Sequence, residues 1–156
     1  MNKLLLKSAL CLIAIPLALT SCNSTGDNGD FRISYLSNST FQKVAESKGS
    51  STEVYYIHLG ASNNTGASVT ISKSDFTLKT GGKDYAALYF PGEIHYSVED
   101  GKSESYMDSH SDTTVIEKNV ETGPSSVSTS SFYICFEVAG SDNYQITYKG
   151  NAISLY

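Results

Sequence analysis

Short alternations of apolar and polar residues dominate the chain after residue 30, and they predict β-strands. The runs are β-branched or aromatic, and Gly, Ser, Asn and Asp separate one run from the next, as in antiparallel all-β proteins. Helical periodicity is almost absent from this part of the chain. The expected strands lie at residues 31–36, 53–62, 67–72, 75–80, 84–90, 113–118, 131–138 and 144–156. About eight short strands of this kind fit an immunoglobulin-like antiparallel β-sandwich.

The run at 131–138 has the clearest alternation. Phe132, Ile134 and Phe136 share one side of the expected strand, whereas Cys135 points to the other side. Successive side chains of a strand point to opposite faces, so this pattern predicts a core-facing apolar stripe.

Glycine positions predict where the strands turn. Gly81-Gly82 separates two expected strands, and Gly150-Asn151 is an expected two-residue hairpin turn, because glycine tolerates positive φ. Pro91-Gly92 ends another strand. Residues 91–112 then lack a strong alternating pattern, and the whole of 97–131 is rich in serine. We therefore expect a long connecting loop at 91–112.

The first 22 residues follow a different pattern. Lys3 and Lys7 precede an apolar run that is too short to span a membrane as a helix, which needs about 20 apolar residues. A basic start, a short apolar core and small residues before a cleavage site predict a secretory signal. The sequence Leu19-Thr20-Ser21-Cys22 resembles the lipobox of bacterial lipoproteins. That resemblance implies cleavage before Cys22 and acylation of its sulfur, and the alternative is an ordinary secretory signal with a coincidental cysteine.

These patterns divide the chain into three expected segments: a lipoprotein signal peptide at 1–21, a lipidated flexible tether at 22–30, and the β-sandwich domain at 31–156. Acyl chains on Cys22 would anchor the domain, because each buried methylene contributes about 0.8 kcal/mol. The expected location is the bacterial cell envelope. Asn23 after the cysteine favours the outer membrane.

Charge and cysteine content narrow the possible partners. The net charge is −5, and removal of the signal makes it more negative, because two lysines and no acidic residue leave with it. An acidic domain without a Lys/Arg cluster is a poor nucleic-acid binder. Cys11 leaves with the signal and Cys22 is lipidated. Cys135 then has no partner for an internal disulfide, and we expect it to be a structural core residue.

A family resemblance covers much of the domain. Residues 55–85 contain a strand ending in Asn63 or Asn64, the motif Asp75-Phe76-Thr77-Leu78, a Gly-Gly turn and Tyr85. With a late Phe136-Glu137-Val138, this order is similar to the immunoglobulin-like domain-of-unknown-function 4352 family, which is common in bacterial lipoproteins and exported proteins. The resemblance implies a fold and an extracytoplasmic setting. It implies no reaction, since the family has no assigned activity.

Candidate chemistry is sparse. His58, His95 and His110 lack the close spacing of a zinc site, and the acidic stretch 98–112 lacks the ligand register of a calcium loop. No Gly-x-Ser-x-Gly motif is present. We therefore assign no catalytic residue, no metal ligand and no cofactor.

The remaining candidate is a binding surface in the expected loop at 91–112. Functional residues of β-sandwiches concentrate in connecting loops, and tyrosines and acidic residues gather in this one. The candidate contact residues are Tyr96, Glu99, Asp100, Tyr106 and Asp108. Since a loop buries little apolar surface, excising residues 99–111 should barely change thermal stability.

The sequence thus favours a membrane-anchored, non-enzymatic binding or accessory module that contacts an envelope protein or an extracellular ligand. One alternative is a carbohydrate-binding surface lipoprotein, because tyrosine offers both a flat apolar ring and a hydroxyl group. A further alternative is a secreted hydrolase.

Overall fold

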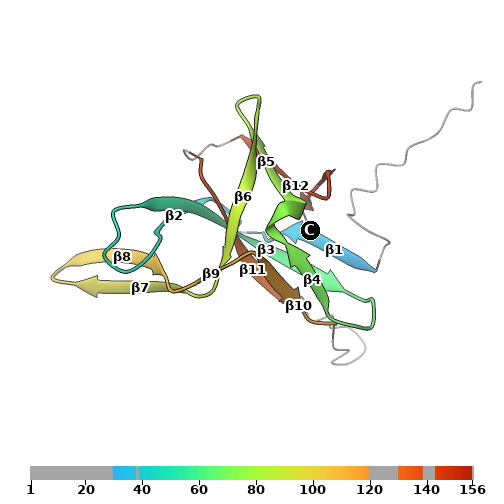
Figure 1. Cartoon of the computed structure of the whole chain (residues 1–156), viewed down its shortest axis with the longest axis horizontal. Helices are drawn as coiled ribbons and strands as arrows, with labels where there is room; N and C mark the ends of the chain where they lie inside the picture. The colour runs from blue at the N-terminus through green and yellow to red at the C-terminus, as the bar shows by residue number, and fades with distance from the viewer. Residues whose placement is uncertain (1–29, 38, 120–129, 139–142, 156) are drawn as a thin grey trace, which may run out of the picture.

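The computed structural model describes residues 30–37, 39–119, 130–138 and 143–155, and almost all of their regular structure is β-strand (Figure 1). The prediction of an all-β sandwich is confirmed. The predicted signal peptide, Cys22 and nearly all of the predicted tether lie outside the described residues. None of the described helices is long and apolar enough to cross a membrane.

The described strands and one short 3-10 helix follow one another in this order: β1 (Phe31–Tyr35), β2 (Gln42–Ala45), β3 (Glu53–Asn63), β4 (Val69–Ser72), η1 (Lys73–Asp75), β5 (Phe76–Thr80), β6 (Lys83–Pro91), β7 (Ile94–Glu99), β8 (Lys102–Met107), β9 (His110–Ser111), β10 (Thr113–Ile116), β11 (Ser130–Phe136), β12 (Tyr144–Tyr148), β13 (Asn151–Ala152) and β14 (Ser154–Leu155).

One large mixed sheet curls around the core. The long strand β3 pairs antiparallel with β1, β2 and β11, while β5 pairs antiparallel with β6 and β12. β6 joins these two parts, because its beginning pairs with β5 and its later residues Ala87 and Tyr89 pair with β11. The register shifts between Cys135 and Phe136, where the sheet bends. β4 and β10 form a separate two-stranded sheet.

The main core lies inside this curl. Ring contacts join opposite parts of the sheet. The ring centroids of Phe76 in β5 and Phe132 in β11 are 5.9 Å apart, and those of Phe31 in β1 and Tyr148 in β12 are 6.1 Å apart. Ile71 of β4 also packs into this core, so the small sheet covers it as well. Full burial of one such side chain contributes about 1.5–3 kcal/mol, which makes this cluster the principal stabilising feature.

A second, smaller core lies on the opposite face of β3 and β11. It consists of Val44, Val54, Tyr56, Met107 and Cys135. The predicted outward-facing side of residues 131–138 is therefore also buried at Cys135, beneath β2 and the end of β8. This explains why both sides of β3 are apolar.

The expected long loop at 91–112 is wrong, because most of this segment is the β7–β8 hairpin. Asp100 and Gly101 form its two-residue turn with φ angles of 51° and 76°. Both turn residues need positive φ in a type I′ turn, which makes Asp-Gly a strong hairpin signal. The register runs from Ile94↔Met107 to Glu99↔Lys102.

The other predicted turns are confirmed, one of them with a shift of one residue. Gly81 and Gly82 connect β5 to β6 with φ angles of 56° and 74°. The turn between β12 and β13 is Lys149-Gly150, with φ angles of 48° and 79°, rather than Gly150-Asn151.

Candidate functional site

The β7–β8 hairpin projects from the sandwich and is the most distinctive feature of the described surface (Figure 1). β8 pairs with β2 only at Ala45↔Tyr106, close to the base of the hairpin. Beyond that pair the hairpin separates from β2 and leaves a cleft of about 260 Å³, lined on the hairpin side by residues 103–105. β7 stands at the end of the strand order and, within the described residues, pairs only with β8.

One face of the hairpin carries an apolar stripe that runs from the second core into solvent. Ile94, Tyr96 and Val98 alternate along β7 and therefore share this face. Ile94 packs against the second core, whereas Tyr96 is 67% and Val98 59% exposed. Exposed apolar side chains on an edge strand are typical of a surface that another chain can contact.

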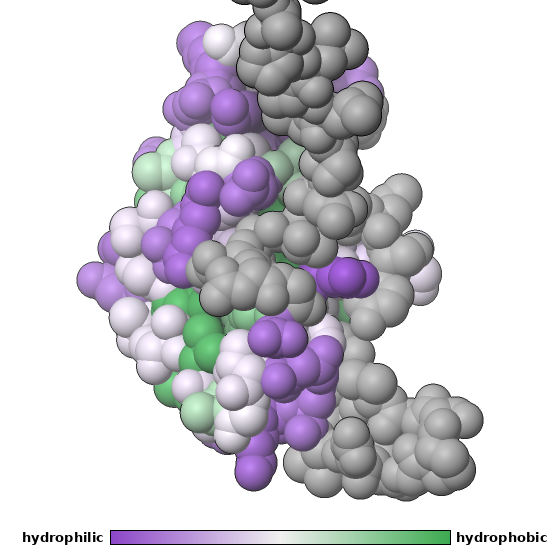
Figure 2. Space-filling view, turned by 90° about the vertical axis from the view of Figure 1, so that its right-hand side faces the viewer, coloured by the Kyte–Doolittle hydropathy of each residue, from purple (hydrophilic) through white to green (hydrophobic). Residues whose placement is uncertain are grey.

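The rest of the described surface offers fewer large apolar side chains. Besides Tyr96 and Val98, only Val115 of β10 is strongly exposed among the large hydrophobic residues of the described ranges. Figure 2 shows a face of the sandwich on which hydrophilic and near-neutral residues cover most of the described surface, with a small hydrophobic area between them.

Polar contacts tie the tip of the hairpin to the turn between β2 and β3. Lys48 Nζ lies 2.8 Å from Glu99 Oε1, and the backbone N–H of Gly49 donates to Glu104 Oε1 at 2.8 Å. Both contacts are exposed, and such pairs contribute little to stability. They leave the Tyr96 and Val98 side chains exposed.

The predicted contact residues do not form one patch. Tyr96 is exposed, and its hydroxyl hydrogen-bonds Ser103 Oγ at 2.8 Å. Tyr106 lies on the other face of the hairpin, half-buried and stacked on the His95 ring at 5.2 Å. Glu99 is paired with Lys48, and Asp100 is a turn residue.

Asp108, the fifth predicted contact residue, belongs to a cluster at the base of the hairpin with Glu93 and His95. His95 Nε2 lies 3.3 Å from Asp108 Oδ2 and 3.9 Å from Glu93 Oε2. One ligand-type atom from each of the three residues lies within 4.8 Å of the other two. The sequence alone predicts no metal ligand here, yet an imidazole and two carboxylates are groups that bind transition-metal ions.

Local hydrogen bonds fix the position of the Asp108 carboxylate. Oδ1 accepts the backbone N–H of Glu93 at 2.9 Å and is 3.1 Å from Ser109 Oγ. The Glu93 N–H and then the hydrogen bond from His95 lower the pKa of Asp108 below its ordinary value. Gly92 permits this close approach, since a Cβ there would lie 2.0 Å from Ser109 Oγ and 2.8 Å from Asp108 Oδ1.

A sequence signal for this cluster exists. A two-residue turn at Asp100-Gly101 places His95 opposite Tyr106, which is the observed pair, and the same register continues to Glu93 and Asp108. Glu93 has no signal of its own when residues 91–112 are expected to be a loop. Under that expectation His95 and Asp108 are not brought together either.

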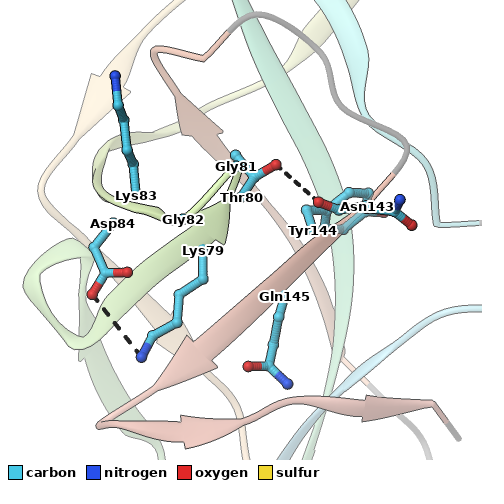
Figure 3. Close-up of a pocket in the computed structure, with 9 residues that line it drawn as sticks. All are labelled: Lys79, Thr80, Gly81, Gly82, Lys83, Asp84, Asn143, Tyr144 and Gln145. Carbon is cyan, nitrogen blue, oxygen red and sulfur yellow. Dashed lines mark hydrogen bonds and ion pairs between the residues drawn. The ribbon is translucent and has the colours of Figure 1, made fainter.

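A second candidate is a shallow groove of about 510 Å³ at the tip of the β5–β6 hairpin, shown in Figure 3. In that view the Lys79 side chain reaches toward Asp84, with Nζ 4.0 Å from Oδ2, and Thr80 Oγ1 donates to the Asn143 carbonyl at 2.8 Å. The Lys83 side chain points away from the Lys79–Asp84 pair and from the Thr80–Asn143 pair. The groove is wide and open, and these contacts occupy part of its polar lining, so it defines no particular ligand.

Cys135 has the environment of a structural residue. It is fully buried in the second core, with Sγ 3.7 Å from Met107 Sδ. Burial, followed by the charge of Glu46, raises the pKa of the Cys135 thiol to about 12. The thiolate is the reactive form, so a buried thiol with a raised pKa is poorly suited to nucleophilic catalysis, and the predicted core position of Cys135 is confirmed.

Comparison with known proteins finds no matching family model, no matching curated protein and no matching solved structure. The resemblance to the domain-of-unknown-function 4352 family stays a prediction. Fold and site together define an all-β sandwich domain with a projecting edge hairpin and a cluster of metal-ligand type at its base.

Proposed function

We propose that this protein is a lipid-anchored, non-enzymatic binding or accessory module of the bacterial cell envelope that contacts a partner protein through its β7–β8 hairpin. The lipobox-like sequence ending in Cys22 supports the anchor and, with Asn23, the outer membrane. The short polar stretch that follows would hold the domain off the bilayer.

The observation that carries the proposal is the exposed edge strand β7. An extended segment of a partner can add to such an edge by main-chain hydrogen bonds, while apolar side chains give specificity. Tyr96 and Val98 supply those apolar contacts, and their stripe continues from the second core. Edge strands with exposed apolar residues invite unwanted pairing unless they serve an interaction, so this arrangement favours a binding role.

The partner class that we favour is an envelope protein with an extended segment. A sugar ligand has less support, because Tyr106 is stacked on His95 and Tyr96 is the only aromatic residue among the strongly exposed large side chains of the described chain. A glycan array tests that alternative directly.

The test uses cross-linking and affinity capture of the anchored protein from its own envelope, with wild type and variants in parallel. Tyr96→Ser combined with Val98→Lys should reduce capture of the partner at least tenfold, because it removes both apolar contacts and adds a charge to the edge. Val115→Lys is the matched control, since Val115 is similarly exposed at 55% but lies on β10. Equal capture by the hairpin variant and wild type would overturn the proposal.

A further inference from the structure

The three residues at the base of the hairpin lie on one face and at the end where β8 pairs with β2. Glu93 directly precedes β7, and His95 is the second residue of that strand. Asp108 directly follows β8, on the opposite side of the hairpin. The His95↔Tyr106 pair and the single β2–β8 pair lie beside them, so this end is held by the sheet. The Glu93 N–H and the stacked Tyr106 ring orient two of the three side chains.

The distances within the cluster suit a small divalent ion. In a tetrahedral site with bonds of about 2.0–2.1 Å, two ligand atoms are about 3.3 Å apart. His95 Nε2 and Asp108 Oδ2 already have this separation of 3.3 Å. Glu93 Oε2 is 3.9 Å from His95 Nε2, and the Glu93 side chain is 79% exposed, so its carboxylate has room to rotate toward the other two ligands.

The donor types select among ions. One imidazole nitrogen with two carboxylates suits zinc and other first-row transition ions, whereas calcium requires six to eight oxygen ligands. The negative net charge of the chain also favours cations over anions.

We propose that Glu93, His95 and Asp108 form a binding site for a divalent transition-metal ion of the zinc class. The ligand atoms are Glu93 Oε2, His95 Nε2 and Asp108 Oδ2. Three protein ligands leave one tetrahedral position for water or for a donor atom of another molecule. This site goes beyond the proposed function, because it binds its ion whether or not β7 contacts a partner.

Isothermal titration of the untagged full chain with Zn²⁺, after chelator treatment, tests the site. The expected result is one ion per chain. His95→Gln and Asp108→Asn should each weaken binding at least tenfold, since loss of a ligand costs more than the 10–100-fold typical of outer-shell partners. His110→Gln is the control, because His110 stacks on Tyr89 outside the cluster and should leave binding unchanged.

Two further measurements keep the outcome decisive. Thermal melting in the presence of chelator should give similar midpoints for wild type and Asp108→Asn, because the Asp108 side chain is partly exposed. Equal midpoints would show that a loss of Zn²⁺ binding in this variant is not caused by unfolding. Titration with Ca²⁺ should give much weaker binding than Zn²⁺. Absence of Zn²⁺ binding, wild-type affinity in both ligand variants, or equal affinity for Ca²⁺ would each overturn the assignment.

Discussion

Asn63 is a buried polar residue whose side chain makes four hydrogen bonds at one end of the sandwich. It is fully buried at the end of β3, and its Nδ2 donates to the carbonyls of Ala67 and Ile116 at 2.9 and 3.1 Å. Its Oδ1 accepts the N–H and hydroxyl of Thr65 at 3.1 and 2.7 Å. One side chain therefore connects β3, the following turn and β10.

Asn63→Ala should lower the free energy of unfolding by about 1–3 kcal/mol, because the buried Ile116 carbonyl loses the Asn63 donor and an unsatisfied buried group costs about that much. Urea unfolding measures the loss. Asn64→Ala is the matched control: Asn64 is exposed and its Oδ1 accepts one hydrogen bond from Asn119 Nδ2 at 2.7 Å, so a change within about 0.5 kcal/mol is expected. Equal effects of the two substitutions would contradict this account.

His58 gives the fold a pH dependence. Its ring is half-buried and stacked on Tyr133 at 4.3 Å, and burial lowers the pKa of His58 below 6.5. Between the lowered pKa and 6.5 the unfolded chain binds more protons than the folded one. The contribution of His58 to stability is therefore constant well above pH 6.5 and falls as the pH decreases through this window.

His58→Gln and His58→Phe should both flatten the decrease in melting temperature between pH 7 and pH 5, because neither side chain titrates. The Phe variant retains a ring against Tyr133, so it separates the loss of titration from the loss of stacking. The two variants are expected to differ in absolute stability but to share the flatter slope. A wild-type slope in both would show that His58 is not the titrating group.

At the scale of elements, the base and tip of the β7–β8 hairpin differ in their contribution to stability. Met107 near the base is 1% exposed and belongs to the second core, whereas residues 97–104 at the tip make only exposed polar contacts to the β2–β3 turn. The sequence-based expectation that excising residues 99–111 barely changes stability is therefore not supported, because this excision removes Met107.

Replacing residues 97–104 by Asn-Gly should change the free energy of unfolding by no more than about 0.5 kcal/mol, since it keeps the pairs from Ile94↔Met107 to Tyr96↔Ser105. Excising residues 99–111 should cost about 2–5 kcal/mol, the range for truncating a buried methionine. Urea unfolding of both variants compares them directly. A tip replacement as damaging as the larger excision would mean that the whole hairpin is part of the cooperative unit.

The strands that the sequence predicts well are those with a strongly apolar face. Phe132, Ile134 and Phe136 determine β11 because their burial dominates its energetics. β8 was missed because its alternation is Ser-Glu-Ser-Tyr, with only Met107 buried, so turn geometry rather than apolar burial forms the hairpin. The Asp100-Gly101 turn signal is present, but the residues on either side of it lack the strong apolar alternation that identifies a pair of strands.

The candidate metal cluster is missed for the same reason, because its sequence signal depends on recognising the hairpin turn. Glu93 and Asp108 are far apart in sequence, and only the hairpin register brings them together. Once the register is known, alternation places Glu93 and His95 on the same face as Tyr106 and Asp108. The strand register is thus what shows that these residues are close enough to form one site.

At the scale of the whole molecule, the proposed attachment to the membrane would depend on residues that precede the sandwich. Cys22 lies outside the described residues, so the anchor is a prediction from the sequence. Acyl chains on a cysteine contribute about 0.8 kcal/mol for each buried methylene, and stable anchoring requires more than one chain. Loss of the sulfur removes all of the chains attached through it.

Cys22→Ser should remove the mass of the lipid and leave either an uncleaved precursor or a soluble species that no longer partitions into membranes. Intact-mass spectrometry and membrane fractionation measure both effects. Cys11→Ser is the matched control, because Cys11 belongs to the predicted signal peptide and leaves with it, so the mature protein should keep its mass and its location. Unchanged mass and partition in the Cys22→Ser variant would refute the lipid anchor.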